Sequence, residues 1–170
     1  CATRGIEQLT LYAFSSDNWK RPADEVHLLM ELFTTHIHRQ VESLVRHDIR
    51  LTVIGRRDRL PQELVDAITM VEARTRSGHR LHVRVAIDYS SRAAIAHGEA
   101  ALIPDVDLLI RTGGERRLSD FVLWESAYAE LAFLDVAFPD LTTEQLDDVF
   151  QDFTTRDRRF GGVLVANGGV

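Results

Sequence analysis

The stretch QLTLYAFSSDNWKRPADEVHLLMELF, residues 8–33, holds a strand pattern, a polar turn and a helix pattern in immediate succession. Residues 9–14 are apolar apart from Thr10, which is typical of a strand buried on both faces of a parallel sheet. From Ala23 onward, apolar residues recur at steps of three and four, and Pro22 stands at the first turn of this pattern. A buried strand that leads through a polar turn into a long amphipathic helix predicts an α/β fold.

Strand and helix patterns continue to alternate along the rest of the chain, and no repeat, low-complexity segment or linker divides it. This alternation predicts a single domain over residues 1–170, with a central, mainly parallel β-sheet flanked by helices. The other predicted strands cover residues 49–55, 81–88 and 106–114. One further helix is predicted to begin at Pro61 and another to cover residues 143–155, with a short helical stub between residues 92 and 104.

The composition of the chain excludes several classes of function and of binding site. The chain has 170 residues and a formal net charge of -6, which argues against broad nucleic-acid binding because that needs an excess of Lys and Arg. Its one cysteine, Cys1, excludes an internal disulfide framework and a cysteine-based zinc site, and it favours a reducing, cytoplasmic compartment. No apolar run approaches the ~20 residues that span a bilayer, and we expect no signal peptide.

Polar clusters follow three of the predicted strands, at residues 14–22, 88–92 and 111–119. Ligands of open α/β sheets bind beyond the carboxyl ends of the strands, so these clusters are candidate site segments. In the first cluster, Ser15 and Asn18 could cap the helix that follows, and capping accounts for one or two such residues. It does not account for Trp19, Lys20 and Arg21 together, so a functional role is favoured here.

The third cluster, RTGGERRLS, has two interpretations that the sequence leaves about equally open. Gly113 and Gly114 permit a turn whose backbone N–H groups converge on an anion, and nearby arginines add forked donors that match phosphate oxygens. Alternatively, this is an ordinary Gly-Gly turn whose surface arginines pair with Glu115 and Asp120. The candidate anion-binding side chains are those of Arg111, Arg116, Arg117 and Ser119.

The segment FVLWESAYAELAF, residues 121–133, is largely apolar but carries Glu125 and Glu130. Glu130 could be a desolvated metal ligand, although spacing alone favours a partly exposed acid on an interface. The seven histidines show no metal-ligand spacing and are interpreted as surface or packing residues. The chain contains neither a G-x-S-x-G elbow nor a Walker motif.

Three blocks together resemble the signature blocks of the cis-prenyltransferases, the undecaprenyl diphosphate synthase family. They are LTLYAFSSDNWKRPADEV, DLLIRTGGERRLSDFVLWESAYAELAF and RDRRFGG, and the resemblance extends from about Gly5 to Gly162. It implies an enzyme that condenses isopentenyl diphosphate with an allylic diphosphate in Z geometry. It further implies Mg²⁺ as cofactor, a homodimer without nucleic-acid partners, and a product delivered to the membrane by a protein with no transmembrane segment.

The resemblance also implies roles for individual residues. In the first block, catalytic roles fall on Ser15, Asn18 and Arg21, and substrate-binding roles on Trp19 and Glu25. The other implied positions are Arg111, Glu115, Arg117 and Ser119 for substrate, Glu130 for Mg²⁺, and Arg158 and Gly161 of the closing R-x-F-G for reaching the partner subunit's site. The long helix from Ala23, with Leu29, Met30 and Phe33, is a plausible wall of a product tunnel.

The sequence departs from the family pattern at two places. The Asp-Gly-Asn turn that ends a strand in the family is expected before Cys1, and its aspartate is implied to handle Mg²⁺ and the allylic diphosphate. The interval near residues 93–103 is short where relatives carry a longer helical segment, and DYSSR replaces a glycine-containing turn. We therefore expect the natural protein to be longer, with both segments present.

Two rival functions remain open at this point. A non-catalytic partner subunit would keep the fold but lose site residues, whereas Asn18, Arg111, Glu115, Arg117 and Ser119 are all present. A general phosphate- or nucleotide-binding module would not account for Trp19 or for the long apolar helix.

Overall fold

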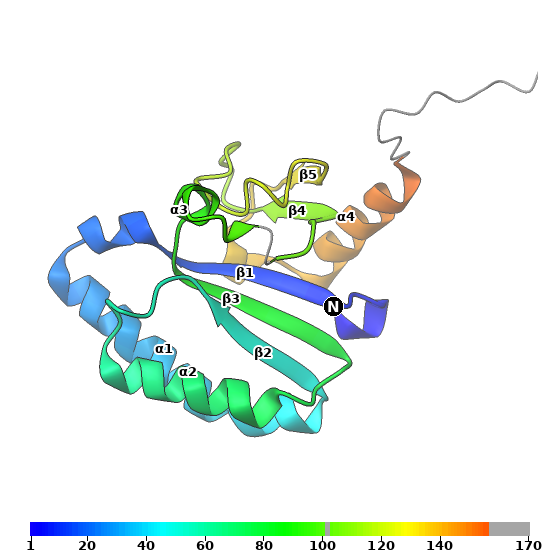
Figure 1. Cartoon of the computed structure of the whole chain (residues 1–170). Coiled ribbons are helices and arrows are strands. Elements are labelled where there is room, and N and C mark those ends of the chain that lie inside the picture. Colours follow the sequence, from blue (N-terminus) through cyan, green and yellow to red (C-terminus); the bar gives the residue numbers. More distant parts are fainter. Residues whose placement is uncertain (101–102, 157–170) are drawn as a thin grey trace, which may run out of the picture. The chain divides into compact units, whose positions relative to one another are not determined.

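The computed structural model describes residues 1–100 and 103–156. The chain divides into two compact units, with the division between Ser90 and Ser91 in the sequence. The first unit contains strands β1 (Gln8–Ser15), β2 (Ile49–Ile54) and β3 (Leu81–Tyr89). They form one parallel sheet in the order β1-β3-β2 (Figure 1). In the register, Leu11 and Val53 both lie opposite Val85, so apolar side chains from all three strands line up.

Two helices, α1 (Ala23–Arg46) and α2 (Gln62–Thr75), accompany this sheet (Figure 1). Pro22 and Pro61 stand at their N-caps, as the sequence predicts for proline at a helix start. The helices pack on each other and on β2. The buried core cluster of this unit consists of Phe14, Val26, Met30, Val53, Leu60, Leu64, Ile68 and Ile87.

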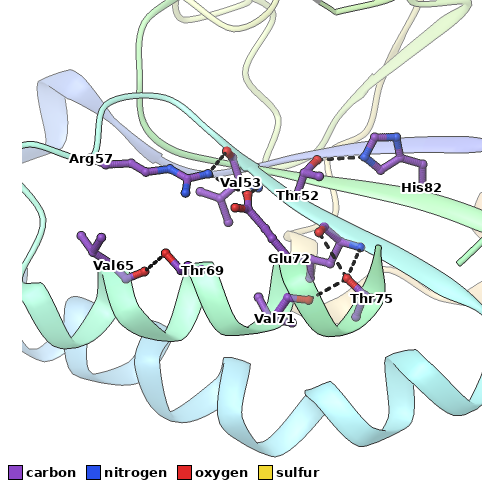
Figure 2. Close-up of polar contacts among 10 residues, drawn as sticks. Thr52, Val53, Arg57, Val65, Thr69, Val71, Glu72, Thr75 and His82 are labelled. Carbon is purple, nitrogen blue, oxygen red and sulfur yellow. Dashed lines mark hydrogen bonds and ion pairs between the residues drawn. The ribbon is translucent and has the colours of Figure 1, made fainter. Parts of the chain in front are cut away.

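Side chains of α2 cover the outer edge of β2, which is an edge strand. The carboxylate of Glu72 accepts the N–H of Val53 at 2.8 Å and Nη2 of Arg57 at 2.7 Å (Figure 2). The hydroxyl of Thr75 accepts the N–H of Leu51 at 3.0 Å. An exposed strand edge is a template for pairing with other chains, so these contacts both satisfy the backbone and block that pairing.

The second unit contains a short helix α3 (Ser91–Ala96), strands β4 (Leu108–Arg111) and β5 (Glu130–Phe133), and helix α4 (Thr143–Thr155). The two strands pair in parallel, with Arg111 opposite Phe133. The sequence predicts β4 and α4, but it does not predict β5, which lies inside the apolar segment 121–133. Helix α4 begins at a capping box, in which Thr142 Oγ1 accepts the N–H of Gln145 at 3.2 Å.

Short 3₁₀ turns complete the described elements, at Ala2–Arg4 (η1), Ser16–Lys20 (η2) and Phe138–Asp140 (η4). Among residues 1–100 and 103–156, no helix is both long enough and apolar enough to cross a membrane. All described strand pairs are parallel, so the predicted fold class is confirmed.

Candidate functional site

The polar turn after β1 is the 3₁₀ turn η2, and Ser15 and Asn18 close it. The backbone N–H of Ser15 donates to Oδ1 of Asn18 at 2.8 Å, as part of a capping box. These two residues therefore cap η2 and not the long helix that follows, because the N-cap of α1 is Pro22, which makes no side-chain cap hydrogen bond. Their hydrogen bond fixes the turn that carries Trp19, Lys20 and Arg21 beyond the carboxyl end of the strand.

Trp19 lies at the boundary of the core. Its ring packs edge to face on Phe14, with ring centroids 5.4 Å apart and an interplanar angle of 81°. Its Nε1 atom is buried, yet it has no hydrogen-bond partner among the described residues. A buried indole N–H normally finds an acceptor, so this unpaired donor marks Trp19 as more than an ordinary packing residue.

Lys20 and Arg21 extend from the same turn into solvent, where each has a carboxylate neighbour. Lys20 pairs with Asp17 at 2.7 Å, and Arg21 pairs with Glu25 at 2.6 Å across one helical turn. Exposed ion pairs of this kind contribute little to stability, so an incoming anion can replace the carboxylate at small cost.

The cluster after β3 contributes a buried carboxylate that the sequence analysis left without a role. The Asp88 side chain is fully buried, and the Arg59 guanidinium grips it in a two-pronged ion pair, with Nε 2.9 Å from Oδ2. The same guanidinium lies over the Trp19 ring, 5.3 Å from its centroid. Sequence reasoning missed Arg59, because in RRDR it looks like one of several surface charges.

The loop after β4 does not form the anion nest that the glycines suggested. Both glycines have positive φ, 86° at Gly113 and 74° at Gly114. Their N–H groups, however, donate to the carbonyl oxygens of Val136 and Leu134 at 2.8 and 3.0 Å. Glycine is needed here for the backbone conformation, and anion binding in this loop depends on side chains instead.

Arg111 closes that loop from the end of β4. Its Nη1 donates to Oγ of Ser119 at 2.8 Å and to the carbonyl oxygen of Arg117. Arg117 pairs with Glu115, both exposed, whereas Asp120 instead accepts the backbone N–H of Arg92 at 2.8 Å. The structure thus brings together the four predicted substrate-binding residues of this block, and the paired-turn interpretation holds for Arg117.

Glu130 begins β5 and is partly buried. Its Oε2 accepts from Nη1 of Arg156 at 2.7 Å, and Arg156 also pairs with Asp152. Hydrogen bonds to these two carboxylates raise the pKa of the Arg156 guanidinium. No group of three or more His, Cys, Asp or Glu side chains that could hold a metal ion occurs among the residues that the structure describes.

Glu125 is a second acid in the same segment, and it is almost wholly buried. Its two carboxylate oxygens have no hydrogen-bond partner within residues 1–100 and 103–156. Burial raises the pKa of this carboxyl, and the nearby Asp105 adds to the effect. Two further predicted site residues, Arg158 and Gly161, lie outside the described residues.

Comparison with known proteins gives consistent matches. The model of a family described as putative undecaprenyl diphosphate synthase matches residues 1–103 and 98–161. Isoprenyl transferase 1 of Bradyrhizobium diazoefficiens is 48% identical over 181 residues, covering 94% of this chain and 73% of the relative. Ditrans,polycis-undecaprenyl-diphosphate synthase ((2E,6E)-farnesyl-diphosphate specific) of Escherichia coli K12 is 42% identical over 188 residues, covering 95% and 74%.

Two solved structures have the same fold. A probable undecaprenyl diphosphate synthase from Campylobacter jejuni superposes with a TM-score of 0.86 at 34% identity, covering 95% of this chain and 86% of the other. Lavandulyl diphosphate synthase from Lavandula x intermedia, in complex with dimethylallyl diphosphate, gives 0.85 at 31% identity, covering 94% and 81%. The two ranges matched by the family model overlap at residues 98–103. This overlap lies where the sequence analysis expects a missing helical segment. That expectation stays a prediction.

Proposed function

This chain belongs to the undecaprenyl diphosphate synthase family of prenyltransferases, and we propose that it joins isopentenyl diphosphate to an allylic diphosphate primer to build a Z-prenyl chain. The observation that best supports this proposal is the arrangement of side chains in the loop after β4. There Arg111, Arg117 and Ser119 form one hydrogen-bonded group, and the two arginine side chains pair with residues of the same loop. Guanidinium groups bind diphosphate oxygens two at a time, which suits this loop to isopentenyl diphosphate.

The turn after β1 supplies the proposed allylic site. Arg21 and the amide of Asn18 face the diphosphate in this scheme, Ser15 and Glu25 hold the turn and its arginine, and Trp19 borders the apolar chain. The exposed Arg21 can donate to the anionic oxygens of the diphosphate. In this scheme, residues of the turn after β1 contact both the diphosphate and the hydrocarbon chain of the allylic substrate.

In the proposed reaction, the C–O bond between the allylic carbon and its diphosphate breaks. The terminal alkene carbon of isopentenyl diphosphate forms the new C–C bond with the allylic carbon. A proton then leaves the methylene on the other side of the original double bond, so that a new double bond forms there, and the diphosphate of the allylic substrate is released. Negative charge develops on the leaving diphosphate, so cations fixed in place beforehand lower the barrier. Arg21 has this role in our scheme, and Arg111 and Arg117 hold the second substrate.

Mg²⁺ fits the proposed site through Glu130. Magnesium in phosphate-transfer sites typically takes one or two protein carboxylates and fills its other positions with water and phosphate oxygens, so a set of three protein ligands is not required. Glu130 uses Oε2 for Arg156 and is partly exposed. Bound Mg²⁺ supplies charge that offsets the negative charge of the diphosphates.

We further propose a homodimer that uses the segment 121–133, in which Trp124, Tyr128, Leu131 and Phe133 are exposed. Several exposed apolar side chains within one short segment favour association. The closing motif with Arg158 and Gly161 would reach toward the partner's site. A cytoplasmic location also stays a prediction, supported by the single cysteine.

The test is incubation of the full-length protein with labelled isopentenyl diphosphate, Mg²⁺ and a panel of allylic primers, followed by sizing of the products and analysis of their double-bond geometry. The panel includes dimethylallyl diphosphate, which the structurally similar lavandulyl diphosphate synthase binds. We expect Z-polyprenyl diphosphates with at least one primer. Absence of label incorporation with every primer would contradict the proposal and favour the non-catalytic partner subunit.

A further inference from the structure

Asp88, Arg59 and Trp19 form a continuous chain of contacts at the carboxyl ends of β3 and β1. The proposed function assigns no task to the first two residues of this chain. Arg59 uses Nε and Nη2 for the two oxygens of Asp88, so the plane of its guanidinium is fixed. The central carbon Cζ of the guanidinium lies over the Trp19 ring, 5.3 Å from the ring centroid.

Asp88 is a rigid anchor for Arg59. Its side chain is 0% exposed, its backbone is left-handed with φ 50°, and its carbonyl oxygen accepts the N–H of Arg56 at 3.2 Å. A buried carboxylate that loses its ion-pair partner carries a large desolvation cost, so Arg59 cannot swing into solvent cheaply. The ion pair therefore holds the guanidinium against the indole even though Arg59 itself is 37% exposed.

Trp19 also packs on Phe14, which is 1% exposed and belongs to the core cluster. The indole thus contacts both an anchored cation and a buried ring, and its buried Nε1–H has no partner among the described residues. A buried donor without a partner is rare in native proteins, and here it coincides with an aromatic ring held by an anchored cation.

We propose that Arg59, anchored by Asp88, is a positioning residue that fixes the orientation of the Trp19 indole for the allylic substrate. The inference rests on the proposed function for the role of Trp19 in substrate binding. It rests on the structure alone for the claim that Arg59 fixes the ring. The two parts are measured separately below.

The structural part is tested by ¹⁹F NMR on protein labelled with 5-fluorotryptophan. The chain has two tryptophans, Trp19 and Trp124, so a Trp124→Phe sample assigns the two resonances. In Arg59→Ala, we expect the Trp19 resonance to shift and broaden while that of Trp124 stays unchanged. Arg56→Ala is the matched control, because Arg56 lies in the same loop but pairs with the exposed Asp58. An unmoved Trp19 resonance in folded Arg59→Ala would overturn the inference.

The functional part is tested by comparing the effects of substitutions on KM for the two substrates. We expect Arg59→Ala to raise KM for the allylic primer roughly 3- to 30-fold, the range of a cation–π contact, with KM for isopentenyl diphosphate little changed. Arg59→Lys, which keeps the charge but not the fork, should fall between Ala and wild type. An equal rise in both KM values, or none, would contradict a role in positioning Trp19 for the primer.

A second variant guards against loss of folding. Asp88→Asn keeps the side-chain shape and tolerates the left-handed backbone, but it removes the charge that anchors Arg59. It should move the Trp19 resonance in the same direction as Arg59→Ala. If wild-type protein shows no turnover with any primer, the proposed function fails while the NMR arm still decides whether Arg59 fixes the ring.

Discussion

Gly55 marks the point where the end of β2 comes too close to β3 for any side chain. Its φ is 111°, and a Cβ atom built there would lie 2.1 Å from the carbonyl oxygen of Ile87. We expect Gly55→Ala to lower the free energy of unfolding by about 2–4 kcal/mol, measured by urea denaturation, because backbone strain and a backbone clash add. Gly5→Ala is the control, since Gly5 has φ 73° but open space around it. Equal losses in the two variants would mean that the clash is not the cause.

His82 makes the stability of the first unit depend on pH. Its ring lies within a 2.8 Å hydrogen bond of the Thr52 hydroxyl (Figure 2). Burial first, and then the charges of Arg84 and Arg50, lower its pKa from 6.5 to about 4. The unfolded chain therefore takes up the proton first as the pH falls, and the stability that His82 contributes above pH 6.5 is lost on the way down to pH 4.

We expect Tm to fall across this range, and to fall less in His82→Gln than in wild type, as followed by thermal melts at successive pH values. The exposed His38 on α1 provides the control variant His38→Gln, whose Tm should follow the wild-type curve. A His82→Gln curve that runs parallel to wild type would contradict the assignment.

At the scale of elements, the contact between α2 and the edge of β2 is the feature most open to test. Thr75 accepts the N–H of Leu51 at 3.0 Å and is 2% exposed, so Thr75→Val leaves a buried donor unsatisfied. We expect a cost of about 1–3 kcal/mol by urea denaturation.

Thr69→Val is the matched control for this variant. Thr69 lies on the same helix, is exposed, and donates to the carbonyl of Val65 at 2.9 Å in the same i−4 pattern as Thr75 with Val71 (Figure 2). Its loss should cost less than about 0.5 kcal/mol. Equal costs in Thr75→Val and Thr69→Val would mean that the bond to β2 contributes nothing measurable.

Elements with a strong local pattern could be predicted from the sequence, and those set by distant partners could not. Helices α1 and α4 were predicted because their apolar periods and end signals are local. Strand β5 was missed, because four residues inside a turn-rich apolar segment become a strand only through pairing with β4. The ion pair between Arg59 and Asp88 was missed for the same reason, since 29 positions separate the two residues.

At the scale of the whole molecule, the family, the fold class and the prenyltransferase assignment predicted from the three sequence blocks are confirmed. The roles of single residues stay predictions. These roles depend on contacts with substrates and with a partner subunit. A sequence block can suggest such contacts only through its resemblance to other members of the family. Of the two interpretations left open for Gly113 and Gly114, the structure does not show the anion nest, because carbonyl oxygens of Val136 and Leu134 accept from both N–H groups.

The homodimer is a prediction at this scale. We expect sedimentation at micromolar concentration to give twice the monomer mass, and Trp124→Asp to shift the protein toward monomer, because Trp124 is 58% exposed in the segment 121–133. Leu28→Asp is the control, since Leu28 is 64% exposed but lies on α1. A wild-type monomer across that concentration range, or equal effects of the two variants, would refute the proposed interface.

The kinetics of Arg117→Ala test most directly the central claim, that the loop after β4 receives isopentenyl diphosphate. Loss of a charge-assisted contact at a closed site typically costs on the order of 10²-fold in rate. We predict a raised KM for isopentenyl diphosphate and a fall of that order in kcat/KM, with Arg56→Ala close to wild type. Near-normal kinetics in a folded Arg117→Ala protein would contradict the account.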